Sequence, residues 1–546
     1  MPSLPTHRTP LLLEIDLTEV PVSPEADDPL AWLRNRGRRQ MRPTLRALHE
    51  AGEDRRVVGL ITKVGGALPW ATMQELRRGV QTFAASGKPT VAWAESLEAG
   101  STNLTAYALA SAFGEIWLQP GGGVGPLGVG LETTFLRGAL DKLGIEPQLE
   151  QRKEYKNAAD RISRTEFTPA HRESLERLTE SVFDDAIEVT AAGRGMDVSR
   201  LRTVIDAGPY TAAEARDAGL VDRLGYRDEV YASLRSRVAD RADLLFADRW
   251  HPARRPAVLK RRKGHVALVE VRGTIVTGRT RRSIGGRQVG SDTVGAQLRA
   301  ARADDRARAV VLRVDSPGGS AVASEVIWRE VVRLRETGKP VVVSMSDVAA
   351  SGGYYVACPA EVIMALPATI TGSIGVFGGK FVVRELLERL GLTTGTVQQG
   401  ERALMYSSRR GFSDDQWARL ASTIDAVYDD FVGKVALGRG RSETEIEAVA
   451  RGRVWTGADA LEIGLVDQLG GLREAVEVAR TRGGLSKDAP VLPALRISPL
   501  ARLGRARNSD DPRALLTASW PTLADLPSAL GVLDEAALRM DPIRLR

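Results

Sequence analysis

The chain has 546 residues, of which 43% are hydrophobic and 27% are charged, a balance typical of a folded globular protein. Its net charge of +7 is small for this length, and no basic patch is interleaved with aromatic residues, so we expect no nucleic-acid partner. The single cysteine, Cys358, excludes an intrachain disulfide and a cysteine-based zinc site. We expect it to be buried by packing rather than reactive.

The start of the chain carries no pattern typical of a secretory signal or a membrane span. Leu11–Leu13 is interrupted at Glu14 and Asp16, which predicts a strand. No apolar run approaches the roughly 18 to 20 residues that cross a bilayer. We therefore expect a cytoplasmic protein or one associated peripherally with a membrane.

Val- and Ile-rich strands alternate with amphipathic helices along most of the chain, which predicts parallel βαβ units and an α/β fold with mainly parallel sheets. In the first half we expect strand 11–17, helix 43–50, strand 57–63, helix 70–85, strand 90–95 and helix 169–193. In the second half we expect strand 265–271, helix 293–303, strand 309–314, helix 324–336, strand 341–346 and helix 413–438.

Two halves of the chain repeat each other. Residues 218–225 (AGLVDRLG) return as residues 463–470 (IGLVDQLG), an offset of 245 from Gly219 to Gly464. Self-similarity at so long a period indicates a duplicated domain rather than a solenoid. We expect an N-terminal repeat at 1–250, a basic linker at 251–264 and a C-terminal repeat at 265–481. Contact of the linker with anionic lipid is the alternative to simple exposure.

The last segment, residues 482–546, differs from both repeats. It contains seven prolines and only short helix signals. We expect a loosely packed extension with a few local helices.

A candidate nucleophile follows the strand expected at 341–346. Ser351 precedes Gly352 and Gly353 at a strand-to-helix turn, where the free N–H groups of the helix N-terminus stabilise negative charge. This arrangement suits a serine nucleophile with an oxyanion hole. A tight turn that merely needs small residues is the alternative.

A second glycine turn, Gly318-Gly319, follows the preceding strand of the same repeat. Because the carboxyl ends of parallel strands meet at one edge of a sheet, we expect this turn and Ser351 to face the same crevice. Glycines there let the backbone approach a ligand closely. A packing turn is again the alternative.

The base that would activate Ser351 is not obviously a histidine. None of the five histidines (His7, His49, His171, His251 and His265) lies in a glycine motif or at a predicted strand end facing the crevice. When the repeats are compared at Glu154 and Glu401, Lys156 of the first repeat corresponds to Ala403 of the second. Burial lowers the pKa of a lysine and makes it a base. Ser373 is the candidate for orienting its amine.

Three motifs occur in succession in the second repeat: residues 313–320 (RVDSPGGS), 349–355 (AASGGYY) and 371–376 (TGSIGV). Together with residues 154–158 (EYKNA), they closely resemble the long, tandem-duplicated form of the signal peptide peptidase A (protease IV) family, within the Clp protease and crotonase superfamily of folds. The resemblance covers roughly residues 10 to 480.

The resemblance assigns a role to each candidate residue. It implies a Ser-Lys peptidase with Ser351 as nucleophile, Lys156 as general base, Ser373 orienting the lysine, and Gly352 with Gly318 or Gly319 as oxyanion donors. It also implies a homotetramer, hydrophobic peptide substrates such as cleaved signal peptides, and no cofactor or metal. Known members usually carry an N-terminal membrane anchor, which we do not expect in this chain.

Two other functions remain open from the sequence. A crotonase-like acyl-CoA enzyme would use the same glycine turns to hold a thioester oxyanion, but would leave Ser351 and Lys156 without a task. A catalytically silent scaffold that binds peptides or membrane partners is the third. The first repeat lacks Ser-Gly-Gly at residues 98–103, so we expect no second active site there.

Overall fold

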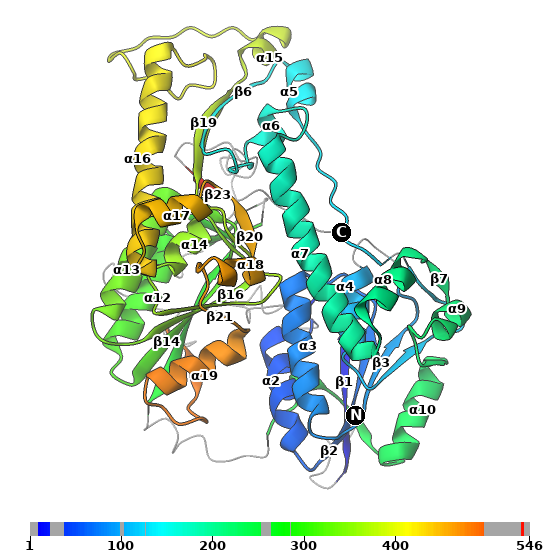
Figure 1. Cartoon of the computed structure of the whole chain (residues 1–546). Coiled ribbons are helices and arrows are strands. Elements are labelled where there is room, and N and C mark those ends of the chain that lie inside the picture. The colour runs from blue at the N-terminus through cyan, green and yellow to red at the C-terminus, as the bar shows by residue number, and fades with distance from the viewer. Residues whose placement is uncertain are drawn as a thin grey trace. The chain divides into compact units, whose positions relative to one another are not determined.

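The computed structural model describes residues 9–21, 38–98, 103–125, 127–252, 264–283, 286–495 and 537–539 (Figure 1). The described residues form two compact units. Unit 1 takes them from 1–131 and 179–257, and unit 2 from 132–178 and 258–543. The units are therefore not consecutive halves of the sequence: residues 132–178 pack within unit 2.

Unit 1 contains a six-stranded sheet in which every neighbouring pair is parallel. The strands, in spatial order, are β8 (Arg223–Leu224), β4 (Glu115–Leu118), β3 (Thr90–Ala94), β2 (Val57–Val64), β1 (Leu11–Leu17) and β9 (Asp243–Phe246). Strand β3 is buried along its whole length, as expected for a parallel strand covered on both faces. A short pair, β5 (Gly123–Val124) and β7 (Tyr210–Thr211), lies apart from this sheet.

The helices of unit 1 supply the apolar cover for this sheet. They are α2 (Met41–Glu50), α3 (Trp70–Ala84), α4 (Asn103–Ala110), α8 (Val198–Asp206), α9 (Ala212–Asp217) and α10 (Arg227–Val238). Helix α10 packs Val230, Tyr231 and Leu234 against Trp93 and Trp117 of the sheet. Helix α7 (Pro169–Arg194) begins in unit 2 and ends in unit 1.

Unit 2 is built on a larger sheet of the same kind. Its main path is β20 (Val454–Thr456), β18 (Ile370–Gly372), β16 (Val341–Ala350), β14 (Ala307–Ser316), β10 (His265–Arg272) and β22 (Val491–Pro493), with β17 (Val362–Ala365) and β21 (Gln468–Leu469) branching from β16. All these pairs are parallel except β18 with β20.

Helices cover both faces of this sheet (Figure 1). The larger buried cluster lies under α12 (Ser291–Ala303), α13 (Ala321–Arg335), α14 (Gly352–Ala357), α16 (Asp414–Arg439) and α17 (Glu443–Val449). The smaller cluster lies under α19 (Leu472–Arg482) on the other face. The short helix α18 (Gly457–Glu462) follows β20.

A second, mixed sheet of unit 2 brings distant parts of the chain together. Its order is β12 (Arg281–Ser283), β13 (Gly286–Gly290), β11 (Thr274–Val276), β15 (Gly318–Ser320), β23 (Ala537–Arg539), β19 (Val376–Val382) and β6 (Glu146–Arg152). Strands β6 and β19 pair antiparallel over their full length, with α5 (Arg137–Leu143) and α15 (Arg384–Arg389) at their far end (Figure 1). This pairing brings the segment that follows β6 into unit 2.

The α/β class with mainly parallel sheets is confirmed, and the expected strands and helices are present with small shifts at their ends. The largest shift is in β16, which continues past Ser346 to Ala350 because β18 pairs with its last residues. In the C-terminal extension, the described residues form the strands β22 and β23 rather than local helices, because each finds a sheet edge to pair with. Most of the linker 251–264 lies outside the described residues.

Helices that combine the length and apolarity needed to cross a bilayer are absent from the described part of the chain.

Candidate active site

Ser351 lies where β16 ends and α14 begins, as expected from its flanking residues. Its backbone adopts φ 56° and ψ −118°, an uncommon conformation for a residue with a side chain. Two hydrogen bonds hold it there: Ser351 N donates to Gly372 O over 2.8 Å, and Tyr355 N donates to Ser351 O over 2.8 Å. The strand and the helix thus fix the serine in a sharp turn similar in kind to a nucleophile elbow.

The Gly318-Gly319 turn lies against the N-terminus of α14, as expected for two loops at the carboxyl edge of one parallel sheet. A Cβ added to Gly352 would be 2.7 Å from Ser324 Oγ and 3.1 Å from Gly319 N, so a side chain here would require Ser324 and the glycine turn to shift. Gly318 N donates to Ser316 Oγ over 3.1 Å. The Gly318 amide is therefore already occupied, whereas Gly319 N lies close to the Cα of Gly352.

Lys156 lies in the irregular segment between β6 and α6 (Asp160–Ser163), and its amine reaches Ser351. The distance from Lys156 Nζ to Ser351 Oγ is 2.8 Å. The amine also donates to Ser373 O and lies 3.0 Å from Ser373 Oγ. All three residues belong to unit 2, so the arrangement forms within one compact unit.

The cluster is shielded from solvent. Lys156 is 1% exposed, Ser351 0% and Ser373 2%. Burial lowers the pKa of Lys156 well below its usual value, because the ammonium form loses its hydration. A neutral amine at 2.8 Å from a serine hydroxyl is positioned to accept the proton of that hydroxyl.

Burial alone does not single out Lys156. Lys380 on β19 is 4% exposed, and burial lowers its pKa to about 8. Its amine donates to Met405 O over 2.6 Å and lies 3.9 Å from the centre of the Phe412 ring. What distinguishes Lys156 is its contact with two serine hydroxyls.

Ser373 is held in a turn as constrained as that of Ser351. It follows β18, adopts φ 49°, and its N–H donates to Arg453 O over 2.7 Å. Its hydroxyl and carbonyl oxygens both face the lysine amine. The sequence named Ser373 as the candidate for orienting the amine, and the family resemblance gave it the same role. A serine after a short strand carries no specific signal by itself.

His171 lies at the start of α7, as expected, but its burial was not apparent from the sequence. It is 2% exposed, and its Nδ1 lies 3.3 Å from Oδ2 of the equally buried Asp160. Phe135 and Phe167 contact the imidazole edge-on. His171 thus packs the segment after Lys156 and is not hydrogen-bonded to Ser351.

Cys358 is fully buried at the end of α14, and burial raises the pKa of its thiol. The thiol donates to Tyr355 O over 3.2 Å. The expectation of a packing role is confirmed.

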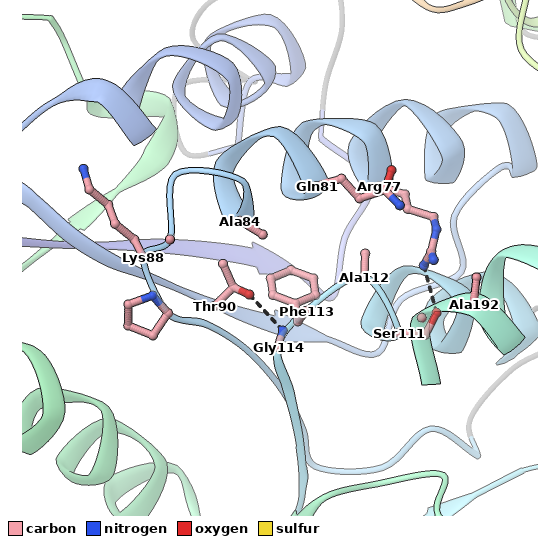
Figure 2. A pocket seen from close by; sticks show the side chains of 13 residues that line it. Arg77, Gln81, Ala84, Lys88, Thr90, Ser111, Ala112, Phe113, Gly114 and Ala192 are labelled. Carbon is pink, nitrogen blue, oxygen red and sulfur yellow. Dashed lines mark hydrogen bonds between the residues drawn. The ribbon is translucent and has the colours of Figure 1, made fainter. Parts of the chain in front are cut away.

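Unit 1 contains a cavity of about 400 Å³, and none of the predicted site residues is among the residues that line it (Figure 2). It lies where β3 begins and just before β4, at the amino ends of those strands. Its buried cation Arg77 donates to Ser111 Oγ over 2.8 Å and to the carbonyl oxygens of Ala108 and Val189. These bonds direct N–H groups of the guanidinium into the fold.

The sequence matches the model of peptidase family S49 over residues 82–240 and 333–486. It is 32% identical over 521 residues to "Protease 4" of Salmonella typhi, covering 91% of this chain and 81% of that protein. It is 31% identical over 443 residues to "Serine protease SPPA, chloroplastic" of Arabidopsis thaliana, covering 80% of this chain and 64% of that protein.

The chain belongs to peptidase family S49. The family and these relatives show a serine peptidase, in agreement with the resemblance found in the sequence.

Among solved structures, the chain is similar to a ClpP1 mutant of Listeria monocytogenes, with 14% identity, a TM-score of 0.25, and coverage of 40% of this chain and 96% of that one. It is also similar to a probable enoyl-CoA hydratase/isomerase of Mycobacterium abscessus, with 19% identity, a TM-score of 0.21, and coverage of 36% and 65%. The fold is defined by the strand order of the sheets in the two units.

Lys156→Met is expected to stabilise the protein at neutral pH. Because the pKa of Lys156 is lowered on folding, the unfolded chain binds its proton more tightly, and stability rises with pH until about 10.4, the usual lysine value. Methionine removes that cost. Thermal unfolding should therefore give a higher Tm for the variant at pH 7, with the difference shrinking toward pH 10. A lower Tm at pH 7 would contradict a buried, desolvated amine.

Proposed function

We propose that this protein hydrolyses peptide bonds with a Ser-Lys dyad, in which Lys156 is the base and Ser351 the nucleophile. The observation that carries the proposal is the 2.8 Å distance between Lys156 Nζ and Ser351 Oγ, together with the burial that lowers the pKa of the amine. Membership of the serine peptidase family S49 supports it.

In the proposed reaction, neutral Lys156 accepts the hydroxyl proton as Ser351 Oγ attacks the peptide carbonyl carbon. The carbonyl oxygen becomes an oxyanion, for which Gly352 N–H and Gly319 N–H are the proposed donors. Lys156 then gives its proton to the leaving amine. Water, deprotonated by the same amine, hydrolyses the acyl-enzyme and restores the serine.

Ser373 is the proposed orienting residue. Its Oγ and carbonyl oxygen, each 3.0 Å from Lys156 Nζ, fix two directions around the amine. The lone pair of a neutral amine held in this way is directed toward Ser351. This role needs no charge on Ser373, in keeping with its burial.

We further propose that the substrate binds in extended form along β15. Strand β23 of the chain itself pairs antiparallel with Gly318–Ser320 and touches β19 at Phe377. That edge, next to the proposed oxyanion donors, accepts a strand through backbone hydrogen bonds. Apolar sequence flanks this edge, including Ala349, Ile374 and Val376, which supports the proposal of small or apolar substrate side chains. Cleaved signal peptides are one such class.

The remaining expectations stay proposals. These are the repeats at 1–250 and 265–481, the homotetramer, and peripheral contact with a membrane. None of them enters the chemistry above, which requires only residues of unit 2.

Ser351→Ala and Lys156→Ala should each lower kcat by about 10⁴-fold or more, because removing one member of a catalytic unit costs about as much as removing the whole unit. A fluorophosphonate probe should label the wild type and not Ser351→Ala. Lys380→Met, which removes the other buried amine, serves as the control and should remain active. Activity that survives both alanine substitutions would exclude the dyad, and saturable binding of an acyl-CoA would favour the crotonase-like alternative.

The pH dependence of kcat/KM should show an acid limb that reports deprotonation of Lys156. Because burial lowers the pKa of this group, activity should rise with pH through a value well below 10.5 and then level off. A peptide without titratable groups is the suitable substrate. A limb near the usual lysine pKa would show that the amine is solvated in the working enzyme.

Removing residues 537–546 should lower the KM for an extended peptide substrate, because β23 no longer competes for the edge of β15. A drop of about 5-fold or more, with kcat within about 2-fold, is expected if each backbone hydrogen bond between β23 and β15 contributes about 1 kcal/mol. A synthetic peptide of the removed residues should restore the higher KM competitively. An unchanged KM would show that substrates bind elsewhere.

A further inference from the structure

One turn of unit 2, Arg451–Arg453 between α17 and β20, touches both segments that carry the site. Tyr155 N, next to Lys156, donates to Arg451 O over 3.2 Å. Ser373 N donates to Arg453 O over 2.7 Å, and Gly452 N donates to Ile374 O over 2.7 Å. Three consecutive residues therefore bond the backbone beside the lysine on one side and the backbone of Ser373 and Ile374 on the other.

Gly452 is in direct contact with the backbone of Lys156. Its φ is 83°, and a Cβ built on it would be 2.5 Å from Lys156 N, 2.6 Å from Lys156 Cβ and 2.7 Å from Lys156 Cα. Real Cβ contacts do not come that close, and the atoms in the way are not the end of a flexible side chain. Only glycine at this position lets Lys156 lie where it does.

The arginines on either side fasten the turn to the lysine segment. Arg451 has a positive φ of 55° and makes a two-pronged ion pair with Glu154, at 2.7 and 3.0 Å. The hydrogen bond from Arg451 lowers the pKa of Glu154 and keeps it charged. Arg453 pairs with Glu173 at 2.6 Å and lies over the Tyr155 ring. Glu154 and Tyr155, the two residues that precede Lys156, are thus each in contact with one arginine.

The first repeat offers an internal comparison. At the offset of 245 residues, Gly452 corresponds to Ala207, and Arg451 and Arg453 correspond to Asp206 and Gly208. Ala207 ends α8 with φ −84° and ψ −8°, an ordinary helical conformation. The repeat without Ser-Gly-Gly thus has an alanine and no arginines here, which indicates that the special turn belongs to the site.

We propose that the Arg451–Arg453 turn is the positioning element that sets the distance from the Lys156 amine to Ser351 and Ser373. This inference rests on the proposed Ser-Lys mechanism. None of the three residues touches the hydroxyl of Ser351 in the described hydrogen bonds, so they act through Lys156 and Ser373. Gly452 lets the Lys156 backbone pack directly against the turn, and the two arginines hold that backbone in place through their ion pairs.

The test is Gly452→Ala, with Gly440→Ala as its matched control. Gly440 also has a positive φ, 63°, but a Cβ there meets nothing within 4 Å, so the control carries the backbone strain without the collision. Gly452→Ala should lower kcat by about 100-fold, the effect of a misplacement of about 1 Å, while KM stays within about 3-fold. Gly440→Ala should change neither.

The pH profile separates positioning from a general loss of structure. Displacing Lys156 from its buried position lets water reach the amine and raises its lowered pKa toward the usual lysine value. The acid limb of kcat for Gly452→Ala should therefore move to higher pH. A folded Gly452→Ala variant with wild-type kcat and an unmoved limb would overturn the inference.

If Gly452→Ala does not fold, the ion pair provides the second test. Arg451→Gln and Glu154→Gln should each lower kcat about 3-fold at low salt, and the double variant should lower it no further, because both remove one interaction. Additive effects, or no effect, would overturn the inference. If Ser351→Ala and Lys156→Ala abolish activity while the Arg451 and Glu154 variants show additive effects or none, the Ser-Lys mechanism stands and only the positioning role of the turn is overturned. The two proposals can therefore fail separately.

Discussion

The site depends on a lysine amine held without water next to two serine hydroxyls. A charged ammonium in that position would lose its hydration and gain only neutral oxygen partners, so burial favours the free amine. The rest of unit 2 can be understood as the means of keeping that amine in place. Strand pairing of β6 with β19 brings the lysine segment in, and the turns around Ser351, Ser373 and Gly452 define the space it fills.

The backbone is least ordinary where the site is. Ser351, Ser373 and Arg451 are the residues with side chains that have positive φ in the described part of the chain, and all three border the lysine. Such conformations cost free energy and persist only where surrounding hydrogen bonds enforce them. Here the enforcing hydrogen bonds are donated by the backbone N–H groups of Ser351, Ser373 and Tyr155. Their acceptors are the carbonyl oxygens of Gly372 at the end of β18, Arg453 and Arg451, respectively. The strain is therefore shared by the elements that hold the site.

Unit 2 holds residues from both halves of the sequence, in keeping with the proposed duplication. The first repeat keeps a parallel sheet and its helices, but residues 132–178 leave unit 1 and complete unit 2. The lysine position in the second repeat is Ala403, so the amine has to come from elsewhere. With two copies of one fold, the proposed Ser-Lys dyad needs to be present only once.

Most of the secondary structure and the candidate site residues could be proposed from the sequence, because Val-rich strands, amphipathic helices and glycine turns after strands are local patterns. The Ser-Gly-Gly turn at Ser351 and the glycines at 318 and 319 are of this kind. Burial of His171 beside Asp160 was not predictable, since α7 reads as a polar helix whose first turn happens to be covered by two phenylalanines. Nor was the role of Gly452, because a glycine near a helix end usually serves as a cap.

The sequence alone indicated the repeats and the α/β class. It also gave Ser351 and Lys156 as a candidate pair, first from the histidine positions and the comparison of the repeats and then through family resemblance. Only the tertiary structure decided that the amine and the hydroxyl lie 2.8 Å apart, that Gly318 N–H is already bonded to Ser316, and that β23 occupies the edge of β15. Local patterns reflect interactions between residues close in the chain. Distances between residues nearly two hundred positions apart depend on how whole strands pair and pack, which no local pattern records.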